Sequence, residues 1–128
     1  MGKILVVDDE PSIVRPLAFV LEKSGHQVLT AANGEEGFKM AESERPDLIF
    51  LDVMMPKKNG YEVCQEIKED PELQQTYVII LTARGVELDE QEKQKVKADE
   101  YMSKPFSPIR IVEHVNAILA EQEAGGGA

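Results

Sequence analysis

Short apolar runs alternate with longer amphipathic segments along the chain, and this alternation limits the folds it can adopt. Four of the runs are rich in β-branched residues and end at turn-forming or charged positions: Lys3–Val7, Gln27–Ala31, Leu48–Leu51 and Val78–Leu81. Runs of this length and composition are typical of β-strands. Because they are largely apolar, without alternating polar positions, both faces of the strands are predicted to be buried.

The segments between these runs begin with residues that favour helix starts. Pro11 suits the first position of one helix, and Asn33–Glu36 has the spacing of a capped start for a second. Gly60 precedes a third helix, and Ser107–Pro108 opens the last. Apolar residues then recur at helical spacing, so each helix has one face to bury.

Two more elements complete the pattern. The segment Leu88–Lys97 contains good helix formers but almost no apolar stripe, so a helix there would be thinly anchored. A fifth strand at Glu100–Ser103 follows mainly from its position. Five strand–helix repeats with short connections predict an α/β fold with one doubly wound parallel sheet. Residues 1–121 are the predicted domain, and 122–128, which are polar and then Gly-rich, are predicted to be a flexible tail or an artificial remnant.

The composition argues against several kinds of partner. Fourteen Lys and Arg stand against twenty-four Asp and Glu, a net charge of −10, which would repel nucleic acid phosphates and acidic membrane surfaces. No apolar run approaches the roughly 18 residues of a membrane span. The single cysteine, Cys64, cannot form an internal disulfide, and its apolar neighbours predict a buried position. We therefore expect a cytoplasmic protein that binds neither nucleic acid nor membrane directly.

Polar side chains stand where the predicted strands end. Asp8 and Asp9 follow the first strand, and Asp52 follows the third. Thr82 ends the fourth strand, and the fifth leads to Lys104. Since the carboxyl ends of parallel strands lie along one edge of a sheet, we expect these five side chains to share a single rim.

Three carboxylates so close together would repel one another unless a cation neutralised them. A cluster of hard oxygen ligands suits Mg²⁺ or Mn²⁺, which would keep coordination sites open for a phosphoryl group. Asp52 could then attack phosphorus through a carboxylate oxygen and form an acyl phosphate. The Thr82 hydroxyl and the Lys104 ammonium group would stabilise the phosphoryl oxygens.

Each of these residues also has a simpler interpretation. Asp8 or Asp9 could cap the helix that begins near Pro11. Lys104, taken alone, could be an ordinary surface lysine. The two histidines, His26 and His114, are predicted to be surface or helix-face residues outside the cluster. It is the joint placement of the strand-end residues that favours a site.

Four motifs, "VVDDE", "LDVMMP", "LTA" and "SKPF", occur in this order within Lys3–Glu121. Together they resemble the receiver domain of two-component response regulators. The resemblance implies a flavodoxin-like (βα)₅ three-layer sandwich with strand order 2-1-3-4-5. It also implies that Asp52 accepts a phosphoryl group from a phosphohistidine on a sensor histidine kinase or a phosphotransfer protein.

The resemblance assigns metal ligands as well. Asp9 and Asp52 would hold Mg²⁺, with Asp8 bound directly or through water. The backbone carbonyl of Met54 would complete the protein ligands.

The resemblance further implies a switch. Thr82 matches the family's switch hydroxyl, Lys104 its phosphoryl-contacting lysine, and Tyr101 its aromatic switch residue, although Tyr101 could also be an aromatic that merely packs. The family signals to a downstream protein target through its fourth helix, fifth strand and fifth helix, as a monomer or as a phosphorylation-dependent dimer. Here that fourth helix is the thinly anchored segment Leu88–Lys97.

Several positions depart from the family pattern or vary within it. Pro16 lies beyond the first turn of the opening helix, where it predicts a kink or local widening. Lys97 stands where the family commonly has glycine, so the turn into the fifth strand could differ. Met54 and Arg84 occupy positions that tune the lifetime of the phosphoryl group.

Three rival functions remain at this stage. A haloacid-dehalogenase-like phosphatase would need an aspartate two residues after Asp52, where this chain has Met54. A nucleotide or flavin module would need a Gly- or hydroxyl-rich phosphate loop, where this chain has "DDEP". A receiver-like interaction module that works without phosphorylation would keep the fold alone. The motifs favour a phosphoacceptor signalling domain rather than an enzyme that acts on outside substrates.

Overall fold

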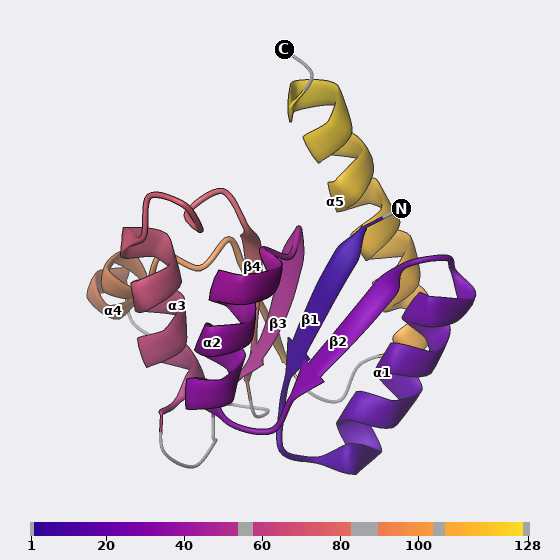
Figure 1. Ribbon diagram of the computed structural model, residues 1–128, viewed down its shortest axis with the longest axis horizontal. Helices are drawn as coiled ribbons and strands as arrows, with labels where there is room; N and C mark the ends of the chain where they lie inside the picture. The colour runs from indigo at the N-terminus through magenta and orange to yellow at the C-terminus, as the bar shows by residue number, and fades with distance from the viewer. Residues whose placement is uncertain (1, 54–57, 83–89, 104–106, 127–128) are drawn as a thin grey trace.

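The computed structural model describes residues 2–53, 58–82, 90–103 and 107–126 of the chain. Five parallel strands form one sheet in the order β2-β1-β3-β4-β5 (Figure 1). The strands are β1 (Lys3–Val7), β2 (Gln27–Ala31), β3 (Leu48–Asp52), β4 (Tyr77–Thr82) and β5 (Glu100–Ser103). The helices are α1 (Pro11–Lys23), α2 (Gly34–Glu44), α3 (Gly60–Glu69), α4 (Glu90–Val96) and α5 (Pro108–Gly126). The predicted fold class and strand order are confirmed.

Helices cover both faces of the sheet, so its strands bury side chains in two directions. The alternation is clear in β3, where Ile49 and Leu51 point toward α2 and α3, while Leu48 and Phe50 point toward α1 and α5. All four are fully buried. Burial of a side chain of this size contributes about 1.5–3 kcal/mol, which explains why the strands are apolar throughout.

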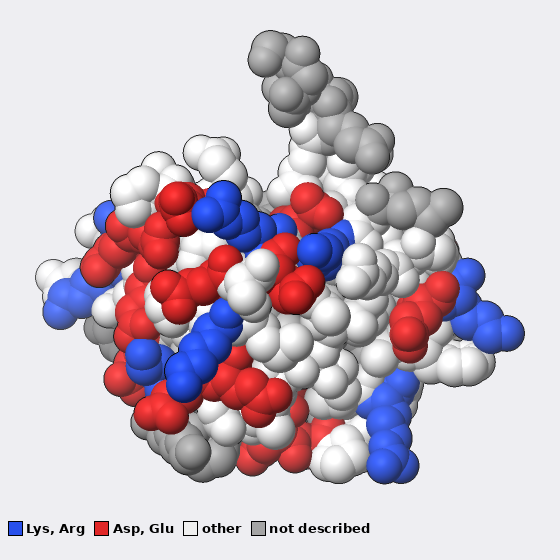
Figure 2. Space-filling model, in the orientation of Figure 1, with Lys and Arg blue, Asp and Glu red and all other residues white. Residues whose placement is uncertain are grey.

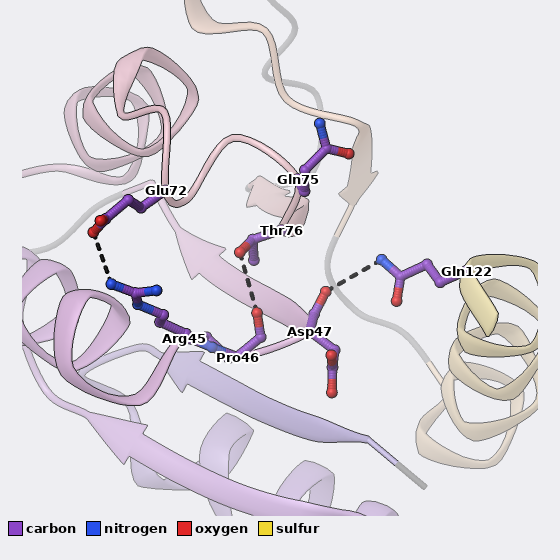
Figure 3. A pocket seen from close by; sticks show the side chains of 7 residues that line it. All are labelled: Arg45, Pro46, Asp47, Glu72, Gln75, Thr76 and Gln122. Atoms are coloured by element: carbon purple, nitrogen blue, oxygen red, sulfur yellow. Dashed lines mark hydrogen bonds and ion pairs between the residues drawn. The ribbon is translucent and has the colours of Figure 1, made fainter. Parts of the chain in front are cut away.

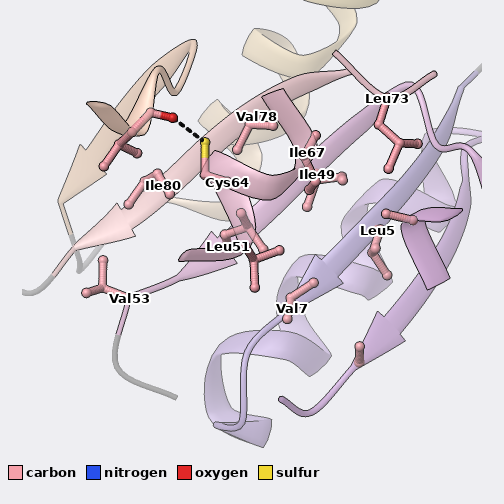
Figure 4. Close-up of a cluster of buried hydrophobic side chains, with 14 residues drawn as sticks. Leu5, Val7, Ile49, Leu51, Val53, Cys64, Ile67, Leu73, Val78 and Ile80 are labelled. Atoms are coloured by element: carbon pink, nitrogen blue, oxygen red, sulfur yellow. Dashed lines mark hydrogen bonds between the residues drawn. The ribbon is translucent and has the colours of Figure 1, made fainter. Parts of the chain in front are cut away.

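Cys64 lies in the core between the sheet and α3 (Figure 4). Its Sγ donates a hydrogen bond to the carbonyl oxygen of Val96, at 3.3 Å. Burial raises the pKa of the thiol to about 12, with a smaller opposing contribution from Lys68. The predicted buried position of Cys64 is confirmed.

Two of the helices begin with an asparagine cap, and the first of these caps was predicted from the sequence. The Asn33 side chain accepts a hydrogen bond from the backbone N–H of Glu36 at the start of α2. Asn59 and Glu62 form a reciprocal capping box at the start of α3. Such caps satisfy backbone donors that the first turn of a helix leaves without partners.

The prediction for His26 was wrong. Its side chain is buried, with Nδ1 accepting a hydrogen bond from the N–H of Gly2, at 3.0 Å, and Nε2 bonding Oδ1 of Asn116, at 2.6 Å. Because Nδ1 accepts from Gly2, Nε2 is the ring nitrogen that donates to Asn116. His114 is partly exposed on α5 and bonds the Glu100 carboxylate, so its predicted helix-face position is confirmed.

Three backbone features extend or test the sequence analysis. Helix α5 continues to Gly126, five residues beyond the expected boundary at Glu121, and the division of the chain into domain and tail stays a prediction. Helix α1 continues through Pro16, and the expected kink also stays a prediction. Lys97 has a φ of 58°, so it adopts the left-handed conformation that glycine favours at this turn. Among the described residues, no helix has the length and apolar character needed to cross a bilayer.

Candidate functional site

Four carboxylates meet at the edge of the sheet where the strands end. Asp8, Asp9, Glu10 and Asp52 each place one oxygen within 4.8 Å of the others. Asp8 and Asp52 are only 3% and 4% exposed, whereas Asp9 and Glu10 are exposed to solvent. The cluster therefore has a buried inner side and an open outer side.

Neighbouring strands bring these acids together. In the parallel pairing of β1 with β3, Val7 lies opposite Leu51, so Asp8 and Asp52 are the next residues on adjacent strands. The backbone N–H of Asp8 donates to the carbonyl of Ala31, which extends the pairing of β1 with β2 by one residue. The position of both acids is thus determined by the sheet itself.

The turn after β1 orients Asp8. Its Oδ1 accepts a hydrogen bond from the backbone N–H of Glu10, at 2.9 Å. Glu10 is the N-cap residue of α1, and this helix has no side-chain cap. The Asp8 carboxylate therefore accepts from the N-cap residue itself, which orients the carboxylate at the end of β1.

Asp52 is the last residue of β3, and hydrogen bonds to β4 and to the start of α3 fix the backbone that follows it. In the pairing of β3 with β4, Asp52 lies opposite Leu81, and the next residue, Val53, donates its N–H to the Leu81 carbonyl, at 3.3 Å. The Val53 carbonyl in turn accepts from the N–H of Gly60 at the start of α3, at 3.2 Å. These contacts fix the backbone beneath the Asp52 carboxylate.

The cluster has the chemistry of a divalent cation site. All its donor atoms are carboxylate oxygens, the ligands that Mg²⁺ prefers. Carboxylates within a few ångströms of one another repel, and a bound cation removes this repulsion. The surface adds to the effect, since acidic side chains gather on the face covered by α2 and α3 and below the strand ends (Figure 2). The residues that are present fit a bound Mg²⁺ or Mn²⁺.

The hydroxyl of Thr82 lies on the strand next to Asp52. Thr82 is the last residue of β4, is 6% exposed, and donates through Oγ1 to the carbonyl of Met102 on β5, at 3.3 Å. This bond ties the end of β4 to β5. A movement of the Thr82 side chain would therefore break its hydrogen bond to β5.

Tyr101 precedes Met102 on β5 and is partly buried. Its ring packs against the core between the sheet and the layer of α2 and α3, and its hydroxyl oxygen is buried. Burial raises the pKa of the phenol above its ordinary value. The ring thus lies on the inner side of β5, one residue from the carbonyl that holds Thr82.

The structure brings together some of the predicted site residues and leaves others untested. It gathers Asp8, Asp9 and Asp52 as expected. Met54, Arg84 and Lys104 lie outside the described ranges. The Met54 carbonyl as a metal ligand and Lys104 as a contact of the phosphoryl group therefore stay predictions. Glu10 was missed, although its position directly after "VVDD" was the signal that could have identified it.

A second polar region lies at the opposite edge of the sheet (Figure 3). An open pocket of about 610 Å³ is bounded there by residues that precede β3 and β4 and by the end of α5. Thr76 donates through Oγ1 to the carbonyl of Pro46, at 3.1 Å, and Gln122 donates to the carbonyl of Asp47, at 3.3 Å. Its side chains bond backbone oxygens and one another, and the described residues that line it include no acid cluster like the one at the strand ends.

Comparison with known proteins gives a consistent result. Residues 4–116 match the model of the response regulator receiver domain. The chain is 49% identical over 121 residues to the alkaline phosphatase synthesis transcriptional regulatory protein PhoP of Bacillus subtilis, covering 94% of this chain and 50% of that protein. It is 38% identical over 120 residues to protein PilH of Pseudomonas aeruginosa, covering 94% and 99% of the two.

Solved structures agree with these sequence relatives. The chemotaxis response regulator CheY4 of Vibrio cholerae superposes with a TM-score of 0.83 at 31% identity, covering 92% of this chain and 98% of that one. The chain spans about half the length of the curated relatives that it matches first.

Proposed function

Because the chain belongs to the family of response regulator receiver domains, we propose that Asp52 accepts a phosphoryl group in a Mg²⁺-dependent reaction. The donor would be a phosphohistidine on a sensor histidine kinase or a phosphotransfer protein. The observation that carries this proposal is the gathering of four carboxylates at one edge of the sheet, two of them buried. Few other functions need so much negative charge in so small a volume.

The proposed chemistry requires one displacement at phosphorus. A carboxylate oxygen of Asp52 attacks, the new O–P bond forms as the N–P bond of the donor breaks, and the imidazole leaves. Asp8, Asp9 and Asp52 would hold the cation, which neutralises their charge and that of the incoming phosphoryl oxygens when bound. The hydrogen bonds of Val53 to Leu81 and to Gly60 would hold the backbone beneath Asp52 in place during this step.

The proposed switch begins at Thr82. A phosphoryl group on Asp52 would offer the Thr82 hydroxyl a charged acceptor, which forms a stronger hydrogen bond than the carbonyl of Met102 does. Release of that carbonyl would free β5, and with it the ring of Tyr101. Lys104 would contact the phosphoryl oxygens. The local change in charge would thus alter the surface formed by α4, β5 and α5.

That surface is where we place the contact with a downstream protein target. Its described part includes a polar cluster in which Tyr77 donates to Glu100, at 3.0 Å, and Glu100 bonds His114 on α5. The protein would act as a monomer or as a phosphorylation-dependent dimer in the cytoplasm. Turnover of outside substrates is not part of the proposal.

Intact-mass measurement after incubation with acetyl phosphate and Mg²⁺ tests the proposed function. We expect a gain of one phosphoryl group that disappears in Asp52→Asn and after chelation of the metal. A gain that survives Asp52→Asn, or no gain in the wild type, would contradict the proposal. A pull-down that compares the wild type with Asp52→Asn would then show which partners depend on phosphorylation.

A further inference from the structure

Two helices begin with a glycine that lies directly against the backbone of another segment of the chain. Gly34 is the first residue of α2, and Gly60 is the first residue of α3. Among the described residues only Gly25 is a glycine with positive φ, so neither Gly34 nor Gly60 is required for its backbone conformation. What distinguishes both is close approach to other parts of the chain.

Gly60 lies on the peptide that follows Asp52. A β-carbon at this position would stand 2.3 Å from the carbonyl oxygen of Asp52 and 3.3 Å from the Cα of Val53. Ordinary van der Waals contact begins near 3.4 Å, so the helix start or the Asp52–Val53 peptide would have to move by about 1 Å. The obstructing atoms are backbone within the sheet, which cannot rotate away as the end of a flexible side chain can.

Gly34 makes a similar contact within the same layer, between the start of α2 and the segment before α3. A β-carbon there would lie 2.0 Å from the carbonyl oxygen of Lys58, the residue before the N-cap Asn59. The start of α2 therefore packs closely against the segment that leads into α3, and the start of α3 packs closely against the backbone of Asp52. Three pieces of backbone form a continuous line from α2 to the buried acid.

We infer that Gly60 is a positioning residue for Asp52. Its missing side chain lets α3 begin against the Asp52 carbonyl, and its N–H bonds the carbonyl of Val53. Together these contacts hold the Asp52 carboxylate where it meets the oxygens of Asp8 and Asp9. Gly34 supports the same arrangement through Lys58. This inference rests on the proposed function, since it explains how the acid is aimed.

The test compares Gly60→Ala with the wild type in two measurements. A misplacement of about 1 Å at a reacting group can reduce a rate by up to a hundredfold. We expect the phosphorylation rate with acetyl phosphate at saturating Mg²⁺ to fall at least tenfold in Gly60→Ala. We also expect weaker Mg²⁺ affinity, measured by the metal-dependent rise in melting temperature. The rate is measured below the unfolding temperature, where a loss of stability alone does not change it. The rise in melting temperature is taken between the metal-free and the Mg²⁺-bound form of each variant, so a lower metal-free melting temperature alone does not change it.

Gly25→Ala is the matched control. Gly25 has a φ of 96°, so alanine there is strained and costs stability, but it follows α1 at the opposite edge of the sheet from the acids. We expect this variant to melt earlier and to keep the wild-type rate and Mg²⁺ affinity. If Gly25→Ala lost as much rate as Gly60→Ala, general destabilisation would explain both and the inference would be wrong.

The remaining outcomes separate the two proposals. A wild-type protein that takes up no phosphoryl group would overturn the proposed function and this inference with it. If the wild type is phosphorylated, and Gly60→Ala has the same phosphorylation rate and the same Mg²⁺-dependent rise in melting temperature, the inference alone would be overturned. If Gly60→Ala does not fold, as judged by circular dichroism, Gly34→Ala replaces it, with an expected loss of rate of severalfold. A folded Gly34→Ala at the wild-type rate would then overturn the inference.

Discussion

The edge of the sheet where the strands begin and the edge where they end hold buried polar side chains of opposite character. Among the described residues, His26 and Thr76 are buried just before β2 and β4, and each is bonded to neutral partners within the protein. Asp8, Asp52 and Thr82 are buried at the ends of β1, β3 and β4, and two of the three are acids beside further acids. One edge satisfies its polar groups, and the other concentrates like charge.

This difference separates stability from function. A buried hydrogen bond between neutral groups contributes about 1 kcal/mol and holds elements together. Gathered carboxylates oppose folding until a cation binds, and such destabilised arrangements persist where function requires them. Substitutions where the strands begin should therefore change the free energy of unfolding. Substitutions of the acids where the strands end should change metal binding and phosphoryl uptake.

The largest expected effect concerns Cys64, whose fully buried thiol, like His26 and Thr76, has a hydrogen-bond partner within the protein, the Val96 carbonyl. Burial raises its pKa from 9 to about 12, which lowers the thiolate fraction about a thousandfold. The buried thiol is also inaccessible to a reagent, so at pH 8 a disulfide reagent should react at least about a thousandfold more slowly with the folded protein than with protein unfolded in guanidinium. Equal rates would show that this region opens readily.

The same shift has a consequence for alkaline pH. Because the folded-state pKa is raised, the stabilising contribution is complete below pH 9 and declines as pH rises toward about 12. Burial and the hydrogen bond to Glu100 also raise the pKa of Tyr77 to about 12. Tyr77 therefore also makes the folded state less stable as the pH rises. Urea unfolding should show lower stability at pH 10 than at pH 8. Cys64→Ala should reduce that decrease.

Next in size is the effect of Asp9→Asn at the acidic edge. With one ligand charge removed, Mg²⁺ should no longer raise the melting temperature, and phosphorylation by acetyl phosphate should slow by about a hundredfold or more. Without metal, the variant should melt above the wild type because one repulsive charge is gone. Calorimetry with and without Mg²⁺ distinguishes these effects. A lower metal-free melting temperature would contradict the repulsion argument.

His26→Ala should have the reverse profile. It removes one buried and one partly buried hydrogen bond and leaves their partners unsatisfied, so we expect a loss of about 2 kcal/mol in urea unfolding. Asn116→Ala removes only one of these bonds and should cost about half as much. Both folded variants should be phosphorylated at the wild-type rate. A slower rate in either would mean that the two edges are coupled.

The smallest expected effect is a gain. Lys97 has a left-handed backbone conformation in the turn between α4 and β5, where the β-carbon crowds the following carbonyl oxygen. Lys97→Gly should relieve this strain, partly offset by greater chain entropy when unfolded, for a net stabilisation of roughly 0.5 kcal/mol. Arg45→Gly, at a φ of 47°, is the comparison, with a smaller gain because it also loses an exposed ion pair to Glu72. A loss of stability in Lys97→Gly would contradict this account.

The sequence predicted the strands, most helix starts and the acids of the site because each depends on local pattern. Apolar runs marked the buried strands, and parallel pairing brought Asp8 and Asp52 to one edge. Strand order came only from the resemblance, since alternation does not specify which strands are neighbours. His26 was misjudged because its bond partner Asn116 lies 90 positions away. The bond from Thr82 to Met102 likewise depends on tertiary contact between strands.

The contact between α1 and α5 on one face of the sheet has a consequence for how the chain is made (Figure 1). Leu17 and Leu21 of α1 share a core with Ile111 and Val115, which come almost a hundred residues later. While a ribosome is still synthesising the middle of the chain, that apolar face has no cover. Nascent protein should therefore be most open to chaperone binding and aggregation until α5 emerges and closes the layer.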